Sequence, residues 1–181
     1  ATEIPGARVR IWARPLHHRV ECFGYRIEEA DSVRMLPDKL AELGVRGASI
    51  KKLQTDGQLQ LGERLIQLAE VSQPRPGQKL AVVMDTRPCA TAVQLAQGVD
   101  VLISEATFTR EHAQEAHDYA HMTAEQAAQI AVQAQARQLV LTHFSQRYPS
   151  TAGHVAEAAA IFPQVVAAED FARVPVPPRQ E

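Results

Sequence analysis

The chain has 181 residues, of which 45% are hydrophobic and 22% are charged, and its formal net charge is -2. This composition predicts a globular domain with one sizeable core. The charge excludes wholesale electrostatic attraction to nucleic acid, so any RNA contact must be a local basic patch. No apolar run approaches the roughly 18 residues of a membrane span, and no basic start precedes an apolar stretch. We therefore expect a soluble, cytoplasmic protein that does not contact a membrane.

The two cysteines, Cys22 and Cys89, are too few for a disulfide framework and lack the paired spacing of a structural zinc site. They fit a reducing compartment. The first residue is Ala rather than Met, so we expect a processed chain or a piece of a longer one.

The first part of the chain predicts two strands followed by an irregular insertion. Apolar and polar side chains alternate over 9–16 and again over 22–27, which predicts a pair of strands. Residues 30–78 contain one short helix, predicted over 37–43 and ended by Gly44, among several turn signals. We interpret 30–78 as an inserted arm with little core of its own.

The later part of the chain predicts the α/β class, because strands alternate with helices. The predicted strands cover 80–84, 99–103, 138–142 and 165–168, and the predicted helices cover 91–97, 124–136 and 153–162. Thr123 and Gln126 form a capping-box pattern at the start of the second of these helices. The proline-rich residues 173–181 predict a C-terminal tail that is a frayed edge strand.

Polar side chains capable of binding metal follow three of the predicted strands. Asp85, Glu105 and His143 each lie just beyond an apolar strand. Ligand crevices of open α/β sheets lie outside the carboxyl ends of the strands, where such side chains can converge. Imidazole nitrogen and carboxylate oxygen both bind zinc, and a carboxylate can bridge two ions. The pattern therefore suggests a hydrolytic metal site.

The same residues also have ordinary interpretations. An aspartate after a strand, such as Asp85, is more often a turn former or helix cap than a ligand. His143 fits a hydrogen-bonded histidine at a strand end, and His17 with His18 fits a polar turn. Three further histidines lie in helical, alanine-rich segments and are expected on solvated faces: His112, His117 and His154. Position alone therefore favours a metal hydrolase only weakly.

Five short segments stand out in chain order: LHHRV followed by FGYRI within 16–27, MDTRPC at 84–89, SEATF at 104–108, HMT with QAA within 121–128, and LTHFSQRY at 141–148. In this order they resemble motifs of the ribonuclease Z family of the metallo-β-lactamase superfamily. Each motif is weak alone, but five in order are very unlikely to occur by chance.

The resemblance implies a fold and an activity. The fold is the C-terminal half of a metallo-β-lactamase fold, an αββα sandwich with two zinc ions at one edge, and 30–78 would be its inserted exosite arm. The activity is that of a tRNA 3′-end processing endoribonuclease, a homodimer that hydrolyses precursor tRNA after the discriminator base.

The resemblance also implies roles for individual residues. His18 and His143 would bind different zinc ions, and Asp85 would bridge both. His121 would protonate the departing 3′ fragment, with Glu105 orienting it. The substrate contacts would include the planar donor fork of Arg147 on a phosphate, with further contacts from the same loop and from the arm: Ser145, Arg46, Lys51 and Lys52.

The sequence departs from the family pattern in ways that bear on activity. Met84 replaces a glycine, Ser104 a histidine and Met122 a serine, and none of these removes an implied ligand. Met84 could tighten the metal site, and Ser104 removes one potential supporting donor. These departures predict reduced activity.

The larger departure is the family's His-x-His-x-Asp-His signature, which the sequence does not contain and which by resemblance precedes Ala1. Without it, we expect the chain alone to bind zinc poorly and to be inactive. Two alternatives stay open: another phosphodiesterase of the same fold acting on cyclic nucleotides or small phosphodiesters, or a noncatalytic half for RNA binding or dimerisation.

Overall fold

The computed structural model describes residues 2–3 and 9–177. The described residues divide into two compact units, one made of 2–3, 9–30 and 78–177 and the other of Asp31–Gly77. No helix in this part of the chain is long and apolar enough to cross a membrane. The second unit spans nearly the residues that the sequence marks as an insertion.

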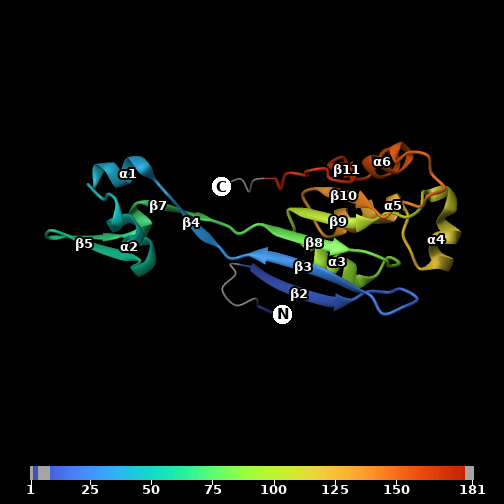
Figure 1. The fold of residues 1–181 in the computed structure, drawn as a ribbon, viewed down its shortest axis with the longest axis horizontal. Helices are drawn as coiled ribbons and strands as arrows, with labels where there is room; N and C mark the ends of the chain where they lie inside the picture. Colours follow the sequence, from blue (N-terminus) through green and yellow to red (C-terminus); the bar gives the residue numbers. More distant parts are fainter. Residues whose placement is uncertain (1, 4–8, 178–181) are drawn as a thin grey trace. The chain divides into compact units, whose positions relative to one another are not determined.

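The first unit is built on a mixed sheet (Figure 1). Within the described residues its seven strands lie in the order β1-β2-β3-β8-β9-β10-β11. Their bounds are β1 Thr2–Glu3, β2 Val9–Pro15, β3 Phe23–Glu29, β8 Lys79–Val83, β9 Val101–Glu105, β10 Leu139–Thr142 and β11 Val165–Ala167. The two predicted N-terminal strands are confirmed as the antiparallel pair β2 and β3. The predicted strands of the later part are confirmed as β8 to β11, and these four run parallel.

Helices cover one face of this sheet. The α-helices of the unit are α3 Ala90–Ala96, α4 Ala113–Tyr119, α5 Ala124–Gln133 and α6 Ala152–Ala159, and a 3-10 turn, η2 Arg110–His112, precedes α4. Side chains of α3, α5 and α6 share a core with the sheet, and more than half of its buried members are alanine. Small side chains allow a helix to approach a sheet closely. The capping box is confirmed, because the Thr123 hydroxyl accepts from the Gln126 N–H and the Gln126 side chain accepts from the Thr123 N–H.

The strand register brings the predicted site residues to one edge. Val83 of β8 pairs with Ser104 of β9, and Thr142 of β10 pairs with Glu105. The residues that follow β8 and β10 therefore leave the sheet beside the end of β9. This edge is the carboxyl end of three parallel strands, where ligand sites of such sheets lie.

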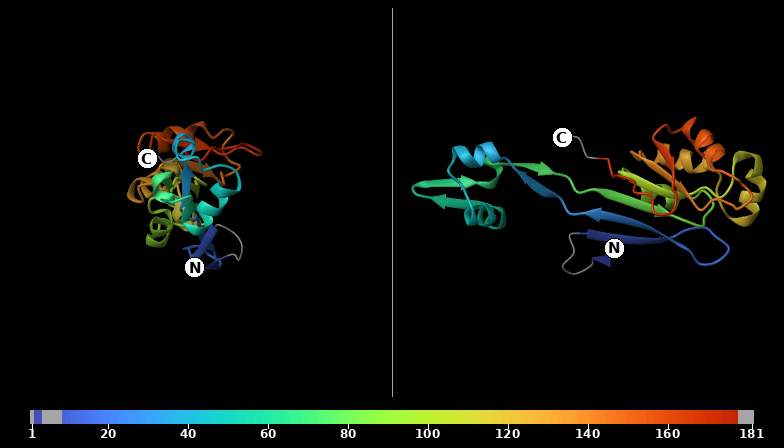
Figure 2. Two further views of the ribbon diagram at one scale, coloured as in Figure 1. Left: turned by 90° about the vertical axis from the view of Figure 1, so that its left-hand side faces the viewer. Right: turned by 45° about the horizontal axis from the view of Figure 1, so that its top comes forward.

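The second unit has a core of its own, so the prediction of an arm with little core is wrong. Its elements are β4 Ser32–Met35, α1 Pro37–Glu42, α2 Ala48–Asp56, β5 Gln58–Leu61, β6 Arg64–Gln67, η1 Leu68–Glu70 and β7 Ser72–Arg75. Strand β4 pairs with β7, and the β5–β6 hairpin lies beside α2 (Figures 1 and 2). Six aliphatic side chains form the core: Leu40, Val45, Leu53, Leu59, Ile66 and Val71. No element contributes more than one of them, and Val45 and Val71 lie between elements, so the sequence shows no periodic pattern.

Two smaller predictions are also wrong. Residues 173–177 belong to no strand, and the rest of the predicted tail lies outside the described residues. Prolines lack the N–H that a sheet ladder needs, which explains why no strand forms there. His154 is fully buried, with its ring against those of Phe144 and Tyr148, instead of on a solvated face.

Candidate active site

The backbone turns sharply at two of the predicted ligands. Asp85 follows β8 with φ 49°, and His143 follows β10 with φ 58°. Residues other than glycine adopt this left-handed conformation rarely, and such strain is concentrated at functional sites. The two turns bring Asp85 Oδ1 to within 3.1 Å of His143 Nε2.

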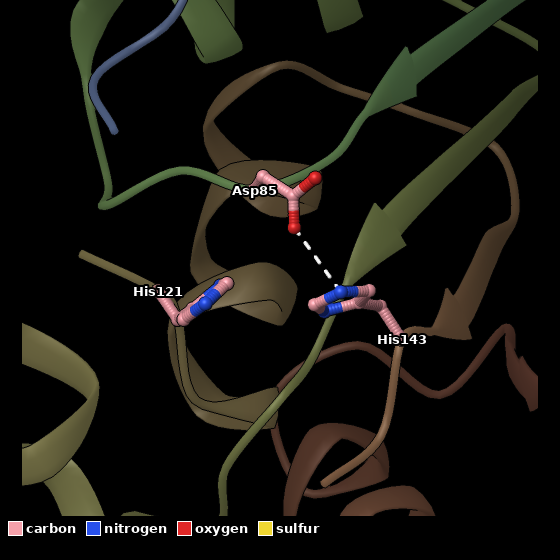
Figure 3. A group of neighbouring side chains, drawn as sticks. All are labelled: Asp85, His121 and His143. Atoms are coloured by element: carbon pink, nitrogen blue, oxygen red, sulfur yellow. Dashed lines mark ion pairs between the residues drawn. The ribbon is translucent and has the colours of Figure 1, made fainter. Parts of the chain in front are cut away.

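His121 completes a compact group with Asp85 and His143. One ligand atom from each residue lies within 4.8 Å of the other two, and Figure 3 shows the three side chains pointing toward a common centre. His121 comes from the loop between α4 and α5, so the group joins three separate segments of the first unit. Two imidazoles and one carboxylate are a donor set suited to zinc.

Glu105 is the buried acceptor that supports this group. It is fully buried, and its carboxylate accepts hydrogen bonds from the Thr86 N–H (2.6 Å), the Thr107 hydroxyl (2.7 Å) and the Met122 N–H (2.9 Å). Its Oε1 also lies 2.9 Å from His121 Nδ1. Burial would raise the pKa of Glu105, but these hydrogen bonds outweigh it and hold the pKa below its usual value.

The same contact determines which ring nitrogen of His121 carries the hydrogen. A carboxylate only accepts, so His121 Nδ1 carries the hydrogen, and in the neutral ring Nε2 is left without one. The hydrogen bond to Glu105 raises the pKa of His121, and partial burial offsets only part of that rise. His121 therefore holds a second proton more readily than an ordinary histidine.

Thr107 fixes the orientation of His143 in a similar way. Its hydroxyl hydrogen is donated to Glu105, so its oxygen accepts from His143 Nδ1 at 2.9 Å. When the ring is neutral, His143 Nε2 carries no hydrogen and faces the Asp85 carboxylate as a second acceptor. Two acceptors 3.1 Å apart repel each other unless a proton or a cation lies between them. Asp85 and His143 therefore fit a divalent cation.

His18 lies beside the group of three but does not belong to it. Its Nδ1 donates to the carbonyl of Ala120 at 3.0 Å, and its ring centroid is 4.9 Å from that of His121. The sequence grouped His18 with Asp85 and His143, whereas the structure places His121 there. Sequence reasoning selected His121 as a proton donor but did not place it next to the ligand pair.

The predicted substrate contacts fall into both units. Arg147 forms a 2.6 Å ion pair with Glu115 and lies over the ring of Phe108. The Ser145 N–H donates to the carbonyl of Thr107, which anchors the loop after β10. The second unit carries the other three, all exposed on or just before α2: Arg46, Lys51 and Lys52.

Two of the three departures from the family pattern, Met122 and Ser104, contact Glu105, and the third, Met84, contacts Cys22. Met122 is buried in the core, while its backbone N–H still reaches Glu105. The Ser104 hydroxyl donates to the backbone carbonyl of Glu105. The Met84 carbonyl accepts from the Cys22 thiol at 3.2 Å.

Sequence reasoning missed Thr86 and Thr107 as supports of Glu105. Both are buried, and both lie inside segments that already carry a resemblance, at 84–89 and 104–108. The sequence signal that could have found them is a threonine close to a candidate ligand or acid, because Thr86 follows Asp85 and Thr107 lies two residues after Glu105.

Comparisons with known proteins show which sequences this chain is similar to. A family model described as a beta-lactamase superfamily domain matches residues 67–144. The chain is 52% identical over 98% of its length to ribonuclease Z of Nocardia farcinica and 48% identical over 94% to that of Thermobifida fusca. It covers 59% and 55% of these two relatives, a share that fits the expected half of the family's domain.

Solved structures show the fold. Human tRNase Z, short form, matches with a TM-score of 0.58 and 24% identity over 96% of this chain and 46% of that one. A metallo-beta-lactamase fold protein from Bacillus subtilis matches with a TM-score of 0.59 and 18% identity over 92% of this chain and 49% of that one. The α/β sheet with helices on one face is thus part of a metallo-β-lactamase fold, as predicted. By sequence the chain is similar to ribonuclease Z over nearly its whole length, and it spans a little more than half of the length of the relatives that it matches.

Proposed function

We propose that the chain is one part of a zinc-dependent endoribonuclease that processes the 3′ end of precursor tRNA. The observation that carries this proposal is the convergence of Asp85, His121 and His143 over the buried carboxylate of Glu105. Similarity to ribonuclease Z supplies the substrate class. The complete enzyme would be a cytoplasmic homodimer with two zinc ions, and the chain alone would cleave little.

Asp85 and His143 would hold a zinc ion, with His18 nearby as a ligand of the second. A bound divalent cation would polarise the phosphodiester and lower the pKa of water. A protonated imidazole cannot bind metal, so the raised pKa of His121 favours a different role for it.

His121 would donate a proton to the departing 3′ oxygen. Its side chain lies beside the ligand pair, where the scissile bond would lie, and Glu105 stabilises its protonated form. Arg147 would hold a phosphate through its planar donor fork once it leaves Glu115. Ser145 would support this contact by fixing the loop.

The second unit would bind the tRNA body away from the cut. Arg46, Lys51 and Lys52 are exposed, as phosphate contacts need to be. Deletion of 31–77 from the complete enzyme should cripple cleavage of precursor tRNA and spare hydrolysis of a small phosphodiester. If precursor tRNA cleavage survived the deletion, a general phosphodiesterase would be the better assignment.

The decisive experiment uses a full-length protein that contains the His-x-His-x-Asp-His segment. His143→Ala and Asp85→Ala should each abolish cleavage of precursor tRNA, because each removes an implied ligand. His117→Ala is the matched control, since His117 is exposed on α4 and lies outside the group. Near-normal cleavage by either ligand variant would refute the metal assignment.

Zinc content tests whether this chain is a half-site. The purified chain should hold little zinc, because the residues present supply too few ligands for two ions. About two tightly bound ions per chain would contradict the half-site and would reopen the question of activity in the isolated chain.

A further inference from the structure

A pocket of about 340 Å³ lies beside the candidate active site, within the first unit. His18, His121 and Thr107 line it on the side of the site. Two arginine–aromatic pairs line the rest: Arg19 with Tyr119, and Arg147 with Phe108. The pocket therefore combines the implied proton donor with two positive charges.

Two contacts order the Arg19 side chain in the lining of this pocket. Its guanidinium carbon lies 4.7 Å from the centroid of the Tyr119 ring, and one of its nitrogens donates to the Asp118 carbonyl at 2.6 Å. Among the described residues no carboxylate forms an ion pair with Arg19. Its charge is thus ordered by an aromatic face and a neutral carbonyl, without being neutralised.

Arg147 is held in the same manner on the neighbouring ring. Its guanidinium carbon lies 5.0 Å from the centroid of Phe108, and the Phe108 and Tyr119 rings stack at 6.5 Å with an angle of 19°. Unlike Arg19, it is paired with a carboxylate, that of Glu115, at 2.6 Å. The hydrogen bond from Arg147 lowers the pKa of Glu115, which keeps this carboxylate charged.

We infer that this pocket is a subsite for the phosphates of an RNA strand, in which Arg19 is a second phosphate-binding residue and Glu115 competes with phosphate for Arg147. The inference rests on the proposed function, because it places a phosphate beside His121. Guanidinium groups ordered on aromatic rings lose little conformational freedom when they bind a phosphate. Arg19 is available at once, whereas Arg147 must first exchange Glu115 for the substrate.

Substitutions at Arg19 and at Glu115 should therefore have opposite effects on RNA binding. Removing the Arg19 charge weakens binding, whereas removing the Glu115 charge strengthens it, because Arg147 is then free for phosphate. A general loss of structure could not produce binding that is tighter than that of the unsubstituted chain. The pair of variants thus separates a phosphate subsite from a purely structural cluster.

The test measures binding of 5′-phosphorylated pentauridylate to the 181-residue chain, with EDTA present, by fluorescence anisotropy over a range of salt concentrations. Arg19→Gln should weaken binding about tenfold and lower the slope of log K against log salt by about one, as expected for one lost phosphate contact. The affinity of Arg19→Lys should lie between those of the unsubstituted chain and Arg19→Gln, since lysine keeps the charge but not the planar donor fork. Glu115→Gln should bind more tightly than the unsubstituted chain.

Arg173→Gln is the matched control, because it removes one exposed positive charge of the first unit that does not line the pocket. No binding by the unsubstituted chain, or equal affinity and salt slope in Arg19→Gln, would overturn the inference. In the complete enzyme, Arg19→Gln should raise KM more than it lowers kcat. If the complete enzyme fails to cleave precursor tRNA while Arg19-dependent RNA binding persists, the proposed function fails and the subsite stands.

Discussion

The two units differ in the side chains that form their hydrophobic cores. The core of the first unit is dominated by alanine, and its helices lie close to a mixed sheet. The core of the second unit, Asp31–Gly77, consists of six larger aliphatic side chains and no alanine. A small unit has few core positions, so each must remove more apolar surface from water.

The units differ further in what else they bury. Every fully buried polar or charged side chain of the described residues lies in the first unit, and the largest network of hydrogen bonds among them surrounds Glu105. A buried carboxylate is expensive and must be fully hydrogen-bonded. The first unit therefore has a buried polar network beneath its candidate site, whereas no described side chain of the second unit is both polar and buried. The following predictions test this contrast.

The largest effect is expected for Glu105→Ala in the first unit. The substitution leaves the Thr86 and Met122 N–H groups and the Thr107 hydroxyl without their buried acceptor. The free energy of unfolding of this unit should fall by about 4 kcal/mol. Urea denaturation measures the loss, and Glu111→Ala, at an exposed position in η2, is the control expected to change little. A similarly small effect of Glu105→Ala would show that the network does not stabilise the fold.

A somewhat smaller effect, confined to the second unit, is expected for Leu53→Ala. Leu53 is fully buried in the core of that unit, and its truncation leaves a cavity that costs about 3 kcal/mol. Hydrogen exchange should show lost protection within 31–77 and unchanged protection in β8 to β10. Leu65→Ala is the control, since Leu65 is 48% exposed in the same unit. Equal loss of protection in both units would contradict their independence.

An effect of about 1 kcal/mol is expected for Thr123→Ala, again in the first unit. The Thr123 hydroxyl accepts the Gln126 N–H at the start of α5, and alanine cannot replace it. Thr151→Ala is a close control, because Thr151 stands before α6 without a side-chain capping bond. Thermal unfolding should show a larger loss of stability for Thr123→Ala than for Thr151→Ala. Equal stability of the two variants would mean that the cap is dispensable.

The mildest test changes only the pH of the metal-free chain. The hydrogen bond to Glu105 raises the pKa of His121. Protonation of His121 therefore stabilises the folded chain below pH 6.5, and this stabilisation is lost as the pH rises through the raised pKa. Burial lowers the pKa of His154, so its contribution is present above 6.5 and is lost as the pH falls through the lowered value.

NMR titration of the imidazole rings should therefore find His121 above 6.5 and His154 below it. Glu105→Gln should bring the value for His121 down, because the charged acceptor is gone. Residues 31–77 contain no histidine, so the stability of the second unit should not change near pH 6.5. If His121 titrated at or below 6.5, the proposed proton donor would lose its support.

The sequence was sufficient wherever the signal was local. The strand pair of β2 and β3, the alternation of strands and helices and the capping box at Thr123 were all readable from residues a few positions apart. The core of the second unit was not, because its members are single residues, such as Leu40 in α1 and Val71 between η1 and β7. His154 was misplaced for the same reason, since its burial depends on Phe144 and Tyr148 from another loop.

By itself, then, the sequence determined the fold class, the family resemblance and the chemical types of the site residues. Only the tertiary structure decided that His121 joins Asp85 and His143, that Thr107 orients an imidazole and that Arg19 faces the same pocket as Arg147. The reason is physical. Strand periodicity and helix caps depend on neighbours along the chain, whereas the site depends on strand register and on the left-handed turns that bring distant residues within a few ångströms.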